Sequence, residues 1–134
     1  MKRLLIALTL IALPLLALAS GDPRPKEQNF KKQLSVSLMR SKLEHSNKIL
    51  EGLTTEDFDT IAKEAKSMRS LTALEHWFRA DTPQYKTQLS AFWYGNDALI
   101  KAAEEKNLDG ATLAYTQLAI SCVNCHKHVR AAAK

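Results

Sequence analysis

A Cys-x-x-Cys-His run near the end of the 134-residue chain constrains its fold more than any other feature. The run is Cys122-Val123-Asn124-Cys125-His126, and it lies in a stretch of helical periodicity from Asp109 to Arg130. Positions i, i+3 and i+4 of a helix share one face, so both thiols and the imidazole are expected to converge. Two thiols at this spacing can add to the two vinyl groups of a haem, and the adjacent His can bind the iron as proximal ligand. The run therefore predicts a covalent haem site on the last helix.

Other uses of the cysteine pair are compatible with the motif taken by itself. A thioredoxin-like redox pair requires a βαβ context, and no strand-like alternation precedes Cys122. A structural disulfide between Cys122 and Cys125 needs no such context. A zinc site normally needs four nitrogen or sulfur ligands, and His128 is the only further candidate close by. We therefore favour covalent haem over a disulfide, a redox pair and a zinc site.

The first 19 residues have the pattern of a secretory signal peptide. Lys2 and Arg3 are basic, residues 4–18 are apolar apart from Thr9, and Ala17-Leu18-Ala19 is an A-x-A cleavage site. The apolar run of about 15 residues is shorter than the roughly 20 that a membrane-spanning helix needs. We therefore expect residues 1–19 to be removed, and residues 20–134 to form one exported, periplasmic domain that is not attached to a membrane.

Charge and motif content exclude several classes of function. The formal net charge is +5, and removing Lys2 and Arg3 leaves 17 basic and 14 acidic residues, or +3. The basic residues are spread along the chain, whereas nucleic-acid binding requires a clustered basic stripe, so nucleic acid is not an expected partner. The chain has no H-E-x-x-H motif and no glycine-rich phosphate loop, and no Ser/His/Asp arrangement is evident. No enzymatic activity is expected beyond electron transfer.

Four amphipathic segments with short connections account for residues 27–130. They are Glu27–Glu51, Glu56–Arg79, Pro83–Lys106 and Asp109–Arg130. Gly52 is expected to end the first helix, and Thr54 with Asp57 to form a variant of the capping box before the second. With no strand signal, the pattern predicts an all-α protein, an antiparallel four-helix bundle with the haem on its C-terminal helix.

The apolar faces of these segments predict the core and the space for a cofactor. The stripe of the first helix contains Val36, Leu38, Met39, Leu43, Ile49 and Leu50. Ser35 and Ser46 fall in the same stripe, and such small residues would leave room for a bulky neighbour. The aromatic residues Phe58, Trp77, Phe92, Trp93 and Tyr115 are expected in the core, some of them against the porphyrin.

This order of elements, a signal peptide and four helices with Cys-x-x-Cys-His on the last, resembles the class II c-type cytochromes, the cytochrome c′-like family. In that family an aromatic residue and an Arg follow the haem His in a C-H-x-x-[YF]-R arrangement. Here the run from Cys125 to Arg130 matches at Arg130 and departs at Val129. The resemblance implies that Cys122 and Cys125 are the thioether anchors, that His126 is the proximal ligand, and that Arg130 lies near a haem propionate. It also implies periplasmic redox partner proteins and a homodimer.

The sixth iron position decides what such a haem does. A Met thioether gives a low-spin centre suited to one-electron transfer, whereas an open position can bind NO or CO. Met39 lies at the middle of the apolar stripe of the first helix, so it is the predicted sixth ligand. Core packing is the alternative role for Met39. His45 is the other candidate for the sixth ligand, which would give a bis-His centre, but it lies at the edge of the stripe. We therefore expect a periplasmic electron-transfer cytochrome, with a haem-based NO/CO-binding protein as the alternative function.

Overall fold

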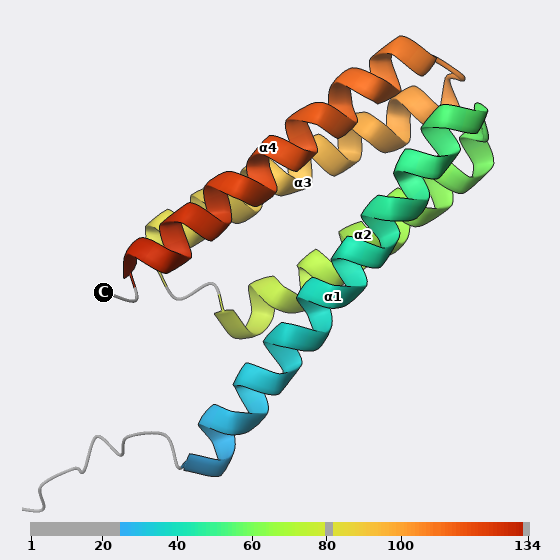
Figure 1. Ribbon diagram of the computed structural model, residues 1–134. Helices are drawn as coiled ribbons and strands as arrows, with labels where there is room; N and C mark the ends of the chain where they lie inside the picture. Colours follow the sequence, from blue (N-terminus) through green and yellow to red (C-terminus); the bar gives the residue numbers. More distant parts are fainter. Residues whose placement is uncertain (1–24, 80–81, 133–134) are drawn as a thin grey trace, which may run out of the picture.

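The computed structural model describes residues 25–79 and 82–132, without the side chains of residues 76–79. The expected signal peptide lies outside the described residues. The described part of the chain forms four helices and no strand: α1 (Pro25–Thr55), α2 (Phe58–Arg79), α3 (Pro83–Glu104) and α4 (Leu108–Ala132). Successive helices run antiparallel, so α1 and α2 form one hairpin and α3 and α4 a second (Figure 1). The all-α prediction with four helices is confirmed. None of the described helices has the length and apolar character needed to cross a membrane.

Both hairpins close with the same backbone turn. Glu56 and Lys106 have φ values of 55° and 54°, in the left-handed region. The N–H of the following residue, Asp57 or Asn107, donates back across the turn to the carbonyl of residue 52 or 102, each at 2.9 Å. This is the Schellman pattern, which satisfies carbonyls that a helix end leaves without an intrahelical partner. The two hairpins are therefore structural counterparts, offset by about 50 residues along the chain.

The expected role of Gly52 at this turn is wrong. Gly52 does not end α1, which continues to Thr55. The glycine is buried, and a Cβ atom on it would lie 2.9 Å from Cγ1 of Ile61 in α2. Its missing side chain therefore permits the close approach of α1 and α2. The left-handed conformation that usually favours glycine falls on Glu56 instead.

The expected capping box is also wrong. Thr54 Oγ1 donates to a carbonyl of its own helix, at residue 51, rather than to the start of α2. Asp57 caps α2 by itself, since its Oδ1 accepts the backbone N–H of Thr60 at 3.0 Å. Asn107 caps α4 in the same way, accepting the N–H of Gly110 at 2.9 Å. Each turn thus ends one helix and starts the next within a few residues.

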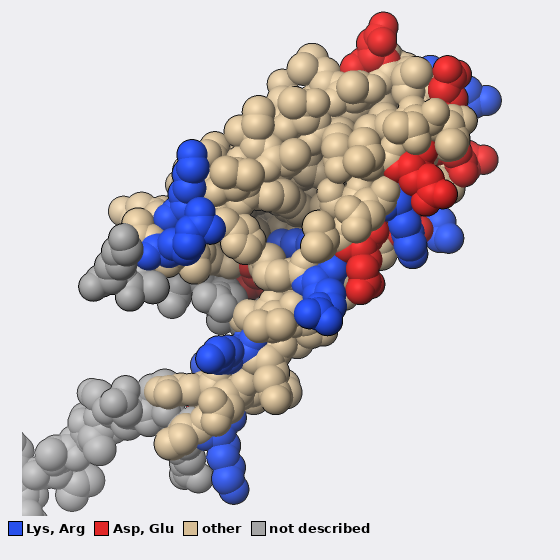
Figure 2. All heavy atoms as spheres, viewed as in Figure 1, with Lys and Arg blue, Asp and Glu red and all other residues tan. Residues whose placement is uncertain are grey.

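The bundle is open along the side between α1 and α4. Helices pack closely in chain order, whereas α1 and α4 barely touch. Figure 1 shows the two hairpins diverging toward the end of α4, and Figure 2 shows the surface hollowed between them. The Ser46 and Tyr115 hydroxyls form a hydrogen bond of 3.2 Å across this side. Val36, Leu43 and Leu50 of the α1 stripe are exposed by 57%, 62% and 48%, so the structure buries only part of this stripe.

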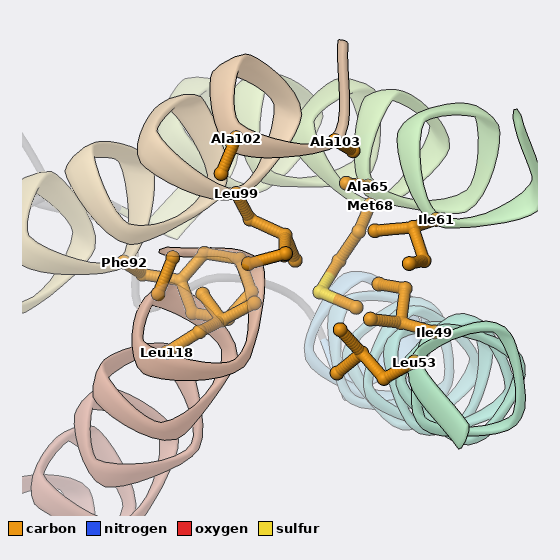
Figure 3. Packing of buried hydrophobic residues seen from close by; sticks show 12 residues of the cluster. Ile49, Leu53, Ile61, Ala65, Met68, Phe92, Leu99, Ala102, Ala103 and Leu118 are labelled. Atoms are coloured by element: carbon orange, nitrogen blue, oxygen red, sulfur yellow. The ribbon is translucent and has the colours of Figure 1, made fainter. Parts of the chain in front are cut away.

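The hydrophobic core fills the end of the bundle near the two turns (Figure 3). Ile49, Ile61, Met68 and Leu99 are almost completely buried, and they come from three different helices. Burial of this apolar area stabilises the fold by about 25 cal/mol per Å². The aromatic residues expected in the core are buried or partly buried where their side chains are described, namely Phe58, Phe92, Trp93 and Tyr115; the side chain of Trp77 lies outside the described residues.

Candidate haem-binding site

A large cavity lies between α1 and α4, on the open side of the bundle. Its volume is about 670 Å³. Cys122, His126 and Leu118 line it from α4, Met39 lines it from α1, and Met68 lines it from α2. Ligand pockets in proteins commonly have volumes of roughly 300–1,000 Å³ and mostly apolar walls. The cavity thus brings together three of the residues expected at the iron and its anchors.

A second, narrow cavity of about 40 Å³ adjoins the first, with which it shares Met39, Lys42, Cys122 and His126. Cys122, Cys125, His126 and Met39 all line it. Cys125 therefore faces the same region as the rest of the motif, as the i, i+3, i+4 spacing predicts. Arg130 lies one turn beyond His126, is exposed, and lines neither cavity.

The donor set in this region suits a haem better than a bare metal ion. Cys122 and Cys125 are not joined in a disulfide. No group of three or more His, Cys, Asp or Glu side chains within the described residues is arranged to hold a metal ion. A haem iron needs only axial ligands from the protein, because the porphyrin nitrogens occupy its other positions. One imidazole, one thioether and two thiols around two adjoining cavities match that requirement.

The environment of Cys122 keeps its thiol neutral. Burial raises the pKa of Cys122, and the nearby positive charge of Lys42 opposes this rise without cancelling it. The thiolate is the form that oxidises and reacts with electrophiles, so a raised pKa protects this cysteine at neutral pH. The raised pKa thus favours the neutral thiol of Cys122 over its thiolate.

A buried charged network next to the cavity was not foreseen from the sequence. Lys42 of α1 lines both cavities, and its ammonium forms an ion pair with the carboxylate of Glu75 in α2. The other carboxylate oxygen accepts a hydrogen bond from the Tyr85 hydroxyl of α3. The Lys42 ammonium also lies 4.6 Å from the ring centroid of Phe92. The network joins three helices at the level of the motif.

One sequence signal could have located Glu75. It follows Met68 and Thr72 at helical spacing, and both of those residues are fully buried. Glu75 is itself only 1% exposed, so it is a charged residue on the buried face of α2. A carboxylate at such a position requires a cationic or hydrogen-bonding partner. The sequence alone did not say which of the nearby cations would supply it.

His45, considered from the sequence because it lies at the edge of the α1 stripe, does not line either cavity. Its Nδ1 lies 2.6 Å from Oε2 of Glu64 in α2. This hydrogen bond lowers the pKa of Glu64, in opposition to the burial of that carboxyl. His45 therefore links α1 to α2 away from the motif.

Comparison with known proteins does not add to this description. No family model matches the chain, and neither a curated protein nor a solved structure matches it. The resemblance to class II c-type cytochromes rests on the motif and the order of the helices alone.

Proposed function

We propose that this chain is an exported c-type cytochrome that transfers single electrons in the periplasm through one covalently bound haem. Cys122 and Cys125 form the thioethers, His126 is the proximal ligand, and Met39 is the sixth ligand. The observation that carries the proposal is the pairing of Met39 and His126 in one cavity, although their helices barely touch. Met39 on α1 and His126 on α4 would supply a thioether and an imidazole to the iron, the ligand pair that suits low-spin, one-electron transfer.

The residues of this chain set the properties of the bound group. Haem, when bound, supplies a one-electron iron couple. The apolar side chains of Met68 and Leu118 in the cavity wall would shield one side of that group from water and lower the local dielectric constant. The Met39 thioether raises the reduction potential relative to a site with His alone. Arg40, in the cavity wall, and Arg130, one turn beyond His126, are cations available to the two propionates.

The test is covalent attachment in a host that matures c-type cytochromes. The full chain is expected to carry haem through a denaturing gel, with the pyridine haemochrome spectrum of a haem that has lost both vinyl groups. Replacing both Cys122 and Cys125 with Ser should abolish the haem stain. The matched control is Val123→Ala, which changes an exposed position inside the motif and should retain haem. Absence of haem from the wild-type protein, or its retention by the double Ser variant, would contradict the proposal.

A further inference from the structure

Charge is distributed unevenly along the bundle. We define the motif half as residues 25–42, 70–75, 83–92 and 119–132, and the turn half as residues 43–69 and 93–118. Among the described side chains, the motif half has eight Lys or Arg and two acidic residues, a net charge of +6. The turn half has six Lys or Arg and ten acidic residues, a net charge of −4. On the face drawn in Figure 2, the acidic side chains gather toward the two turns.

The positive charge of the motif half is at the surface. Both acidic residues of this half take part in ion pairs, Glu75 with Lys42 and Glu27 with Lys31. The remaining six cations are all exposed, and they come from α1, α3 and α4: Lys26, Lys32, Arg40, Lys86, Lys127 and Arg130. Two haem propionates would lower the net charge of this half from +6 to +4, so it would still be positive.

In the turn half, by contrast, cations sit beside acids. Lys66 lies 2.6 Å from Glu104, and Arg69 lies 2.7 Å from Asp97. These pairs neutralise one another locally, and the excess of acidic residues gives this half its negative sign. The molecule is therefore an electric dipole whose positive end includes Met39, Cys122 and His126 of the candidate haem cavity.

We propose that the motif half is the docking surface for a partner protein with an acidic surface, which exchanges its electron at the opening between α1 and α4. The inference rests on the proposed function, because the electron resides on the haem. The two ends of the molecule carry opposite charge, so the electric field of an acidic partner orients the molecule during its approach. The positive end then meets the partner first. Such steering raises association rates by roughly 10- to 1,000-fold at low salt. An anionic membrane is the competing occupant, and the experiment includes it.

The first measurement uses small redox probes of opposite charge. Ferrous holoprotein is mixed in a stopped-flow instrument with hexacyanoferrate(III), an anion, or with tris(phenanthroline)cobalt(III), a cation. In each reaction one electron leaves the haem iron and reduces the probe metal, and no bond or proton is exchanged. The rate with the anion should fall as salt is added, because salt screens attraction, and the rate with the cation should rise. Rates that do not depend on salt, or that depend on it with the opposite sign, would overturn the docking proposal and leave the cytochrome proposal standing.

Matched charge reversals locate the surface. Lys32→Glu with Lys127→Glu changes two exposed cations of the motif half. Lys63→Glu with Lys101→Glu makes the same change in charge in the turn half, at side chains that are 79% and 74% exposed. At low salt the first pair should slow the reaction with hexacyanoferrate(III) roughly tenfold, and the second pair less than about twofold. Equal effects of the two pairs would show that net charge alone matters, which contradicts a localised docking surface.

Two further probes separate a protein partner from a membrane. Poly-L-glutamate, a model acidic polypeptide, should compete with hexacyanoferrate(III) for the wild-type protein but not for the Lys32/Lys127 variant. Phosphatidylglycerol vesicles should not retain the holoprotein at a salt concentration where poly-L-glutamate still competes. Retention by the vesicles under conditions where the polypeptide no longer competes would assign the surface to a membrane instead. A protein that carries no haem would not reduce either probe, so failure of the proposed function is distinct from failure of the docking surface.

Discussion

Replacing Glu75 with Gln tests the buried network beside the cavity, because this change removes a charge and almost no volume. Glu75 is 1% exposed and its partner Lys42 is 12% exposed, so neither charge is solvated. The amide of Gln can still accept the hydrogen bond from Tyr85, but the Lys42 ammonium loses its counter-ion. Removing one partner of a buried ion pair typically costs about 3–5 kcal/mol, because the other charge stays buried. We therefore expect the free energy of unfolding of the holoprotein to fall by about 3–5 kcal/mol.

A double-mutant cycle separates this effect from ordinary packing loss. Lys42→Met combined with Glu75→Gln removes both charges, and stability should return to within about 1–2 kcal/mol of the wild type. The measurement is urea unfolding of the haem-loaded protein, followed by circular dichroism. The matched control is the exposed pair Lys66 and Glu104, whose side chains are 57% and 54% exposed, and where the coupling energy should stay below about 1 kcal/mol. A coupling energy for Lys42 and Glu75 no larger than that of the control would refute the reasoning.

The Glu75→Gln variant is also expected to change the midpoint potential of the haem. Glu75 lines the narrow cavity together with Cys122, Cys125 and His126, so its negative charge would act on the iron of the proposed haem. Negative charge favours ferric over ferrous iron, because the oxidised centre carries one more positive charge. Glu75→Gln should therefore raise the midpoint potential, and a lower potential would contradict the placement of the haem beside this network.

Three further changes test the ligand, the helix packing and the response to acid. Met39→Ala should convert low-spin ferric haem to high spin, lower the potential and allow CO to bind; a wild-type protein that already binds CO readily would favour the gas-binding alternative. Gly52→Ala should destabilise the protein by about 1–3 kcal/mol in urea unfolding, because the new Cβ would meet Ile61 at 2.9 Å; unchanged stability would contradict the close approach of α1 and α2. The hydrogen bond from His45 lowers the pKa of Glu64 in the folded protein below its ordinary value of 4.5. The ionised Glu64 carboxylate therefore stabilises the fold above about pH 4.5, and this stabilisation is lost as the pH falls through the lowered pKa of the folded state. His45→Ala should flatten this acid-induced loss of stability, measured by thermal unfolding as a function of pH. An unchanged profile would show that the hydrogen bond between His45 and Glu64 is not its cause.

The elements that were predicted correctly depend on interactions within a few residues. Helical periodicity and the break before Pro83 were enough to find four helices, since helix formation is governed by neighbours along the chain. The Thr82 hydroxyl caps α3 by accepting the N–H of Tyr85 at 3.1 Å, which is again a local contact. In the same way, the spacing of Cys122, Cys125 and His126 places them along one stretch of α4 whatever the other helices do.

The turn between α1 and α2 shows where local patterns become ambiguous. A glycine near a helix end suits a left-handed terminus, but it equally suits a close contact between helices. Which use applies to Gly52 depends on the position of Ile61, nine residues away on another helix. The local pattern therefore indicated a turn at the right place and assigned its residues to the wrong roles.

The separation of α1 from α4 is a property of the tertiary structure alone. An apolar stripe specifies which face of a helix avoids water, but it does not specify how far away the facing helix lies. For this reason Val36 and Leu43, which belong to the stripe of α1, are exposed beside the cavity while Leu38 is buried. The partnership of Lys42 with Glu75 likewise joins residues 33 positions apart, which only the packing of α1 against α2 brings together. Local sequence could place the thiols and the imidazole on one helix, whereas the cavity in front of them follows from how four helices share one core.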